Sequence, residues 1–196
     1  MTIVVLLGTE NHKRRIFGHH LCAYMETIDG KQTKLIDVRD VVARNLHKCM
    51  FDSASHDFVV NDISTIDHHR ATLNQKDSLL WVAKIAHEIC RETDVGYKHV
   101  VITGLKSRAE IETFRDEHKA VNVYLFDPME DREDEAWRPP KVWKNIPVSD
   151  DTDYATVAGE LAEVWFQELL SGEPAEKIPE IERYGIIDYD SWRDAQ

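Results

Sequence analysis

Short apolar runs alternate with helical patterns along most of the chain, and this alternation constrains the fold more than any other feature. The apolar runs are rich in Val, Ile and Leu and lie at residues 2–7, 34–36, 98–103, 120–126 and 146–148. Runs of this length are typical of strands buried on both faces. The segments with apolar residues at helical spacing are 13–26, 38–49, 76–93, 107–118 and 149–170. The sequence therefore predicts an α/β fold with a mostly parallel sheet and helices on both faces.

In two parts of the chain the apolar residues recur with no clear period. Residues 50–75 mix His, Asp and Ser, while residues 127–145 hold a dense run of charges and three prolines. We expect irregular structure in the first segment and a mobile loop in the second, either solvated or closing as a lid. For 196 residues we expect one domain at 1–170, followed by an acidic and aromatic tail at 171–196 that packs on the body or on a partner.

The segment "GTENHKRR", residues 8–15, follows the first predicted strand, at the edge of a parallel sheet where ligands bind. In the motif GxxxxGK[ST], backbone N–H groups surround phosphates, the Lys neutralises them and the hydroxyl holds Mg²⁺. Here Gly8 has the first position, but Lys13, Arg14 and Arg15 replace the second Gly, the Lys and the Ser or Thr. Asp37 and the turn at 104–106 follow other predicted strands and are expected at the same edge.

This segment has two interpretations. It is either a phosphate site with changed chemistry, in which Gly8, Lys13, Arg14 and Arg15 bind a nucleotide or phosphate, or the solvated basic start of a helix. Three cations at a helix N-terminus oppose the helix macrodipole. A bound anion would relieve that cost, which favours the first interpretation.

The middle of the chain resembles a known family. Residues 79–128, "LLWVAKIAHEICRETDVGYKHVVITGLKSRAEIETFRDEHKAVNVYLFDP", are similar to a segment of the phage-type deoxynucleoside monophosphate kinases. That segment has a Trp-Val helix, a "GY" turn, a strand ending in Asp-x-Arg and a Glu-bearing helix. Phosphomevalonate kinases of animals are similar there, and both groups are P-loop kinases. Weaker likenesses are "LIDVRDVVA", "RATLNQ" and "DDTDYATVAGELAEV", so that the resemblance extends over residues 2–170.

The resemblance implies a P-loop fold of the nucleoside monophosphate kinase type and transfer of phosphate from ATP, with Mg²⁺, to a (deoxy)nucleoside monophosphate. Lys13 and Arg14 would stabilise the transferring phosphate, and Asp37 would be the carboxylate for Mg²⁺. The residues expected to hold the acceptor are Arg39, Arg70, Gln75, Lys106 and Arg108, with Glu110 matching the helix Glu. Gly104 and Lys106 replace the Asp and Arg of the strand end. Because several catalytic parts are replaced together, a non-catalytic descendant that binds an anion or a protein partner is the alternative.

Two rival sites use His residues. "TIDHHR", residues 65–70, resembles the Asp-His-His signature of a Mn²⁺-dependent phosphoesterase superfamily, with Asp37 and Asp62 as further ligands. A zinc site is the other rival. Its candidate ligands are His19, His20, Cys22, His47, Cys49 and His56. The neighbours His19 and His20 point about 100° apart on a helix, so they do not face one metal easily.

Charge and cysteine content narrow the expected partners. The net charge is −12, from 36 acidic and 24 basic side chains, which argues against binding of duplex nucleic acid. The three cysteines are widely spaced and indicate reduced thiols in the cytoplasm, which would be the host cytoplasm if the protein is phage-encoded. No apolar run has the length of a membrane span. The sequence is compatible with a homodimer or with a protein partner.

Overall fold

The computed structural model describes residues 1–8, 10–50, 62–77, 79–127 and 142–171. Its sheet has five strands, in the order β2-β3-β1-β4-β5. The strands are β1 (Thr2–Gly8), β2 (Thr33–Asp37), β3 (His99–Thr103), β4 (Val121–Phe126) and β5 (Lys144–Pro147). All four pairings in the sheet are parallel. The α/β fold predicted from the sequence is therefore confirmed, and it is consistent with a P-loop nucleoside monophosphate kinase-like fold.

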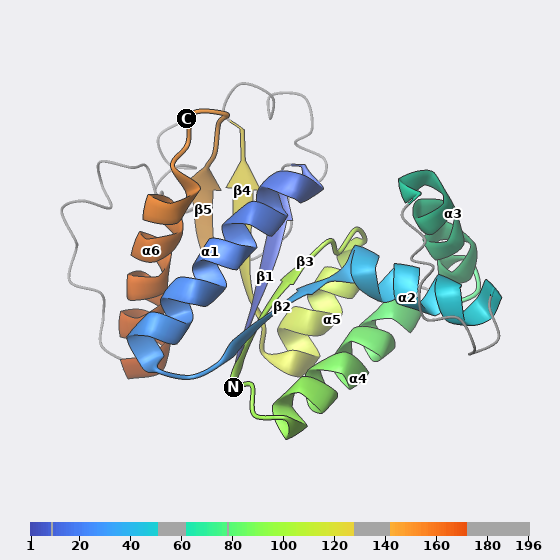
Figure 1. The fold of residues 1–196 in the computed structure, drawn as a ribbon, viewed down its shortest axis with the longest axis horizontal. Coiled ribbons are helices and arrows are strands. Elements are labelled where there is room, and N and C mark those ends of the chain that lie inside the picture. Colours follow the sequence, from blue (N-terminus) through green and yellow to red (C-terminus); the bar gives the residue numbers. More distant parts are fainter. Residues whose placement is uncertain (9, 51–61, 78, 128–141, 172–196) are drawn as a thin grey trace.

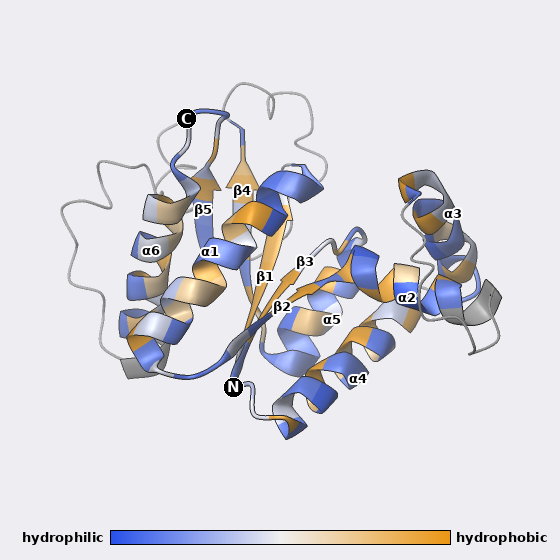
Figure 2. Ribbon diagram, in the orientation of Figure 1, coloured by the Kyte–Doolittle hydropathy of each residue, from blue (hydrophilic) through white to orange (hydrophobic). Residues whose placement is uncertain are grey.

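Helices cover both faces of the sheet, as predicted (Figure 1). The helices are α1 (Asn11–Asp29), α2 (Val38–Met50), α3 (Ile63–Asn74), α4 (Leu80–Asp94), α5 (Arg108–His118) and α6 (Tyr154–Trp165), and a π-helical turn, η2 (Phe166–Ser171), follows α6. In β1, Ile3, Val5 and Leu7 pack with α2, α3, α4 and α5, while Val4 and Leu6 pack with α1 and α6. This alternation follows from the two-residue period of a strand. Figure 2 shows the apolar strands between helices whose outer sides are hydrophilic.

The prediction of irregular structure for residues 50–75 is wrong for α3, which is a regular helix from Ile63 to Asn74. Only Ile66 and Arg70 of this helix are buried, so its apolar period is too weak to recognise. The Asp62 side chain caps the helix by accepting a hydrogen bond from the Thr65 backbone N–H. Figure 1 shows α3 beside α2, at some distance from the sheet. Tertiary packing therefore stabilises a helix that its own sequence predicts poorly.

Three expectations concern residues outside the described part of the chain. They are the segment 51–61, the central part of the charged segment at 128–141 and the tail at 172–196. Among the described residues, no helix combines the length and the apolar character that crossing a membrane requires.

Candidate functional site

Four strands bring polar residues or glycines to the carboxyl edge of the sheet (Figure 1). Gly8 ends β1, Asp37 ends β2, Gly104 follows β3 and Asp127 follows β4. Because the strands are parallel, these positions meet at one edge, where α1, α2 and α5 also begin. The expectation that Gly8, Asp37 and the turn at 104–106 gather there is confirmed.

The connection between β1 and α1 is shorter than the motif GxxxxGK[ST] requires. Only residues 9 and 10 separate Gly8 from the first residue of α1, Asn11. Asn11 and His12, which the motif comparison assigned to its spacer, therefore belong to the helix. Gly8 itself is needed, because its φ is +84° and an added Cβ would lie 1.9 Å from the carbonyl oxygen of Leu125. The segment has the glycine of a phosphate loop but not its length.

Lys13 is held by carboxylates that follow β4 and β5. Its Nζ lies 3.0 Å from Oδ1 of Asp150 and 3.8 Å from Oδ2 of Asp127, and the residue is buried. The hydrogen bond to Asp150 raises the pKa of Lys13 above its ordinary value, although burial opposes the shift. The Lys13 ammonium is thus charged and already neutralised by the protein.

Arg14 folds back over the end of β1. Its Nη1 donates to the carbonyl oxygen of Gly8, its Nε to Oγ1 of Thr103 at 3.4 Å and its Nη2 to Oδ1 of Asn11 at 3.2 Å. Burial lowers the pKa of Arg14 from 12.5 to about 10, and the charge of Arg39 adds to this lowering while Asp37 opposes it. Arg14 therefore stays protonated at neutral pH, and most of its donors are bound to the protein.

Asp37 is buried and accepts hydrogen bonds through both oxygens. Oδ1 accepts from the backbone N–H of Arg39 at 2.9 Å, and Oδ2 accepts from Nδ2 of Asn11 at 3.3 Å. Arg15 lies 3.7 Å from Asp37 and 3.5 Å from Asp40. A Mg²⁺ ion, which requires octahedral oxygen ligands, would have to displace these donors. The side chains around Asp37 as they lie do not fit Mg²⁺.

The three cations at the start of α1 thus have carboxylate neighbours of their own. Asp127 and Asp150 face Lys13, Asp37 lies near Arg14, and Asp37 and Asp40 face Arg15. The unfavourable interaction with the helix macrodipole is compensated within the protein. The first turn of α1 consequently gives no argument for a bound anion.

A small cavity of about 20 Å³ lies at the same edge. It is lined by Asn11, Arg14, Arg39, Val42, Ile66, Asp67, Arg70, Gly104 and Lys106. Four of these residues are cations, Arg14 from α1, Arg39 from α2, Arg70 from α3 and Lys106 from the turn before α5. We call this set the cationic cavity. As the side chains lie, its volume admits about one water molecule.

The cations of this cavity differ in how firmly they are held. Arg70 is 4% exposed; its Nη1 donates to the carbonyl oxygen of Gly104 at 2.6 Å and its Nη2 to both oxygens of Glu110, at 3.0 and 2.9 Å. Its Nε is buried without a hydrogen-bond partner in the described structure. Lys106 is half-exposed and pairs with Asp67 at 2.9 Å. The guanidinium of Arg39 forms no hydrogen bond or ion pair with any described residue.

The cationic cavity therefore collects three of the five residues predicted to hold an acceptor, together with Arg14. The other two lie elsewhere. Gln75 is exposed at the C-terminal end of α3, and the exposed Arg108 pairs with Glu112 at 2.8 Å, one turn along α5.

The side chains of the two rival sites do not converge. Asp67 pairs with Lys106, and His69 lies 3.2 Å from Oδ1 of Asn45. The exposed His68 has no contact with a carboxylate of the described residues. Of the zinc candidates, Cys22 is buried, and burial raises the pKa of its thiol to about 12. The described residues contain no group of three or more His, Cys, Asp or Glu side chains that could hold a metal ion. The side chain of Cys49 and residue His56 lie outside the described part.

Sequence reasoning missed four residues that shape this edge, Asn11, Thr103, Asp127 and Asp150. Asp127 directly follows β4 and Asp37 ends β2, so the strand-end rule was sufficient to find Asp127. Asn11 and Thr103 contact Arg14 through side chains that no motif marks. Asp150 lies after β5 and reaches Lys13 only because β1, β4 and β5 are neighbours in the sheet.

No protein-family model matches this chain, and no curated protein matches it. The geometry at the carboxyl edge therefore carries the functional argument. The resemblance of residues 79–128 to the phage-type kinases stays an expectation from the sequence.

Proposed function

We propose that this protein binds the phosphate group of a small phosphorylated molecule, of the (deoxy)nucleoside monophosphate class, at the cationic cavity. The observation that carries the proposal is the convergence of four cations from separate segments at the carboxyl edge of a parallel sheet. Guanidinium groups match the geometry of phosphate oxygens and remain charged at any physiological pH. The nucleoside part of the proposal rests on the resemblance of residues 79–128.

Three of the four cations have distinct roles in this proposal. Arg70 is fixed by Glu110. Arg39 is half-buried and has no ion pair with any residue that the structure describes. Lys106 is half-exposed, as is its partner Asp67. The cavity is too small for a phosphate as it lies, so the ligand displaces the carboxylate of Asp67 and becomes the partner of Lys106. Arg39 then supplies a positive charge that no described residue balances.

The contacts at the start of α1 favour binding without phosphoryl transfer. Transfer depends on a cradle of backbone N–H groups, a mobile cation and Mg²⁺ at the transferring phosphate. Here the connection to α1 is two residues long, Lys13 is held by Asp150, and Arg14 donates to Gly8, Asn11 and Thr103. We therefore propose the non-catalytic form of the kinase-like fold.

Calorimetric titration at low salt tests the proposal. Thymidine monophosphate, the other deoxynucleoside monophosphates and inorganic phosphate are the ligands, and thymidine without phosphate is the control. We expect the monophosphates to bind and thymidine not to bind. Arg39→Gln should weaken binding about tenfold or more, because it removes charge-assisted hydrogen bonds. Asp67→Asn should strengthen binding several-fold, because it removes the competing carboxylate.

Arg108→Gln is the matched control, because Arg108 is an exposed arginine that does not line the cavity. Equal effects of Arg39→Gln and Arg108→Gln, or equal binding of thymidine and its monophosphate, would contradict the proposal. A coupled assay with ATP and Mg²⁺ addresses the kinase interpretation. Turnover that Lys13→Ala abolishes would show that the non-catalytic form is wrong.

A further inference from the structure

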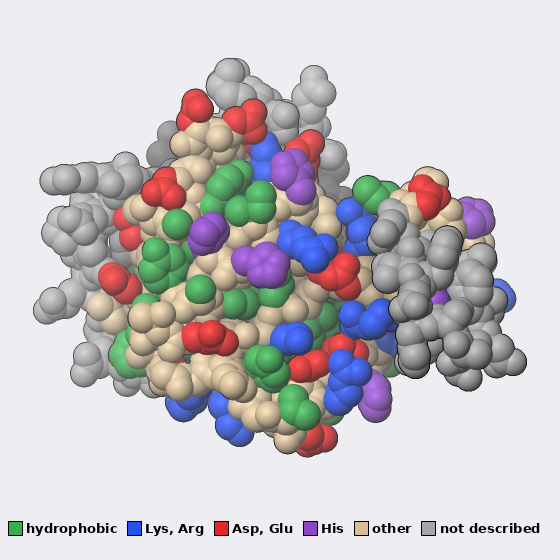
Figure 3. All heavy atoms as spheres, viewed as in Figure 1, with side chains coloured by type: hydrophobic (Ala, Val, Ile, Leu, Met, Phe, Trp, Pro, Cys, Tyr) green, Lys and Arg blue, Asp and Glu red, His purple; other side chains and the backbone are tan. Residues whose placement is uncertain are grey.

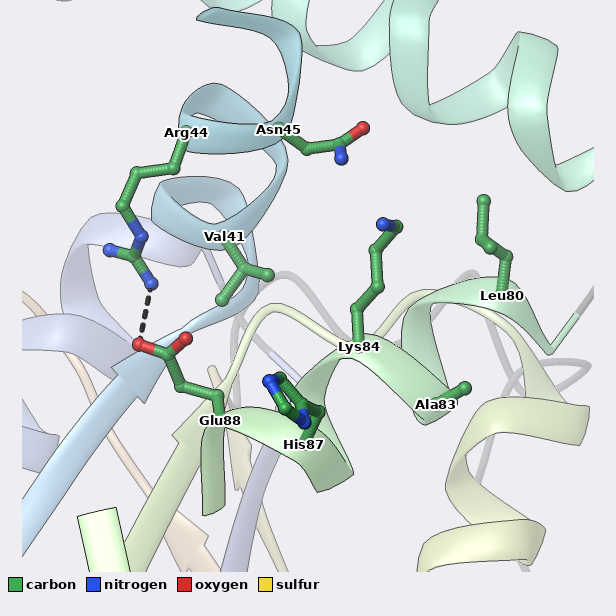
Figure 4. A pocket seen from close by; sticks show the side chains of 8 residues that line it. All are labelled: Val41, Arg44, Asn45, Leu80, Ala83, Lys84, His87 and Glu88. Atoms are coloured by element: carbon green, nitrogen blue, oxygen red, sulfur yellow. Dashed lines mark hydrogen bonds and ion pairs between the residues drawn. The ribbon is translucent and has the colours of Figure 1, made fainter. Parts of the chain in front are cut away.

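A second depression lies between α2 and α4, separate from the cationic cavity (Figure 4). Its volume is about 360 Å³, and it is lined by Val41, Arg44, Asn45, Leu80, Ala83, Lys84, His87 and Glu88. We call it the α2–α4 groove. None of these residues lines the cationic cavity. Small-molecule sites typically have volumes of about 300–1,000 Å³, so this groove has the size of a ligand site.

The groove combines an apolar floor with a basic rim. The apolar lining residues are Val41 of α2, which is 7% exposed, and Leu80 and Ala83 of α4, which lie on the other side of Lys84 in Figure 4. In Figure 4, Lys84 extends from α4 toward α2, and the ion pair of Arg44 with Glu88 crosses one end of the groove. Figure 3 shows basic side chains over α2 and α4, with acidic side chains between them. A ligand that fits this surface has an apolar body and at least one charged end.

The charges of the lining residues favour a negative ligand. Arg44 and Lys84 are positive, and Glu88 is the one carboxylate among the lining residues. Glu88 Oε1 is already shared, since Nη2 of Arg44 lies 2.9 Å away and Nη2 of Arg91 2.7 Å away. The half-buried Lys84 forms no hydrogen bond or ion pair with any described residue. Among the described residues this ammonium has no counter-ion, and an anion bound in the groove would supply one.

The field of Lys84 also reaches the neighbouring helix α3. Burial lowers the pKa of His69, and the charges of His68 and Lys84 add to this lowering. His69 lies next to the groove, because its Nε2 is 3.2 Å from Oδ1 of the lining residue Asn45. The positive potential therefore extends over this end of the groove.

We infer that the α2–α4 groove binds a small amphipathic anion, an organic carboxylate with an aliphatic or aromatic body. The body lies on Val41, Leu80 and Ala83, and the carboxylate accepts a hydrogen bond from Nζ of Lys84. The amide of Asn45 is a second donor at the same end. This inference is independent of the proposed phosphate binding, because the two sites share no lining residue.

The test uses the fluorescence of 8-anilinonaphthalene-1-sulfonate, which has an apolar aromatic body and one negative charge, with the full chain. We expect saturable binding that octanoate displaces. Acetate, which lacks the apolar body, and 1-octanol, which lacks the charge, should displace the probe poorly. Inorganic phosphate should not displace it, which separates this groove from the cationic cavity.

Substitutions in and outside the groove show where the probe binds. Ala83→Glu places a negative charge at an exposed position of α4 and should weaken binding about tenfold or more. Lys84→Gln removes the cation and should weaken binding about threefold, because a partly exposed ion pair contributes about that much to affinity. Lys98→Gln is the matched control, because Lys98 is exposed and lies just before β3, at the opposite edge of the sheet. It should leave the affinity unchanged.

Several results would overturn the inference. They are equal affinities for Lys84→Gln, Lys98→Gln and the original protein, displacement by 1-octanol as strong as by octanoate, and absence of saturable binding. Circular dichroism melts show whether Ala83→Glu is folded, and Lys84→Gln provides the test independently of that variant. Sedimentation equilibrium tests whether a second copy of the chain occupies the groove instead. Self-association that Ala83→Glu abolishes would mean that a second copy of the chain, not a small anion, fills the groove.

Discussion

Gly8 and Gly30 both have positive φ angles, +84° and +68°, but their surroundings differ. At Gly8 an added Cβ would lie 1.9 Å from the carbonyl oxygen of Leu125, whereas at Gly30 nothing lies within 4 Å. Gly30→Ala should therefore destabilise the protein by about 1–2 kcal/mol, only because alanine is strained at a positive φ. Gly8→Ala adds a clash between neighbouring strands, and we expect a further loss of about 1–3 kcal/mol.

Urea unfolding of both variants measures this difference. Because both substitutions are Gly to Ala at positive φ, the unfolded-state contribution is the same and cancels in the comparison. Equal losses of stability would mean that β1 and β4 separate easily at Gly8. In that case the close approach of Gly8 to the Leu125 carbonyl would not constrain residue 8 to glycine.

Arg70 and Glu110 form a buried ion pair, in contrast to the exposed pair of Arg108 with Glu112. Glu110 also accepts hydrogen bonds from the backbone N–H groups of Lys106 and Ser107, at 2.9 and 3.0 Å. Arg70→Met leaves a buried carboxylate without its counter-ion and should cost about 3–5 kcal/mol. Arg108→Met should cost less than about 1 kcal/mol. Chemical denaturation compares the two, and similar losses would show that the buried pair is not structural.

Helix α6 begins at a cap that depends on pH. Asp153 accepts hydrogen bonds from Oγ1 of Thr156 at 2.7 Å and from the backbone N–H groups of Ala155 and Thr156, at 3.1 and 3.4 Å. The hydrogen bond from the Thr156 side chain is the largest cause that lowers the pKa of Asp153 below its ordinary value of 3.8. Because the folded-state pKa is the lower one, the cap's contribution is complete above pH 3.8 and is lost as the pH falls through the folded-state pKa.

Asp153→Ala should therefore lower the thermal midpoint by about 3 °C at neutral pH, and this difference should shrink in acid. Asp153→Asn is the control, because Asn caps helices equally well and does not titrate. Thermal melts at several pH values measure both variants. A difference between the original protein and Asp153→Ala that is constant with pH would show that the ionised carboxylate does not form the cap.

At the scale of the whole molecule, the described residues up to Ser171 contain all five strands and both clusters of buried apolar residues. These clusters contain the largest fully buried side chains, Trp81 of α4 and Trp165 of α6. We expect a chain that ends at Ser171 to unfold cooperatively, with a thermal midpoint close to that of the full chain. Calorimetric melts of the two chains test this. A large loss of stability would show that the domain does not end near residue 170.

The sequence by itself determined the alternation of strands and helices, because strands buried on both faces have to be apolar and helices on a sheet need one apolar stripe. It also located the carboxyl edge, since Gly8, Asp37 and Gly104 end or follow their strands. It missed α3, whose only buried apolar residue is Ile66. A helix whose apolar residues recur so weakly can be recognised only when its packing against α2 is known.

Only the tertiary structure decided the partners of the cations. "HKRR" predicts a positive segment, but it does not reveal that Asp150 neutralises Lys13 or that Arg14 donates to Gly8 and Thr103. Asp150 and Thr103 are distant in sequence from these cations, and strand order brings them together. Arg39, Arg70 and Lys106 likewise come from separate segments and meet because the carboxyl ends of parallel strands lie at one edge. Residue types follow from the sequence, whereas the pairing of charges depends on distances that only the folded chain defines.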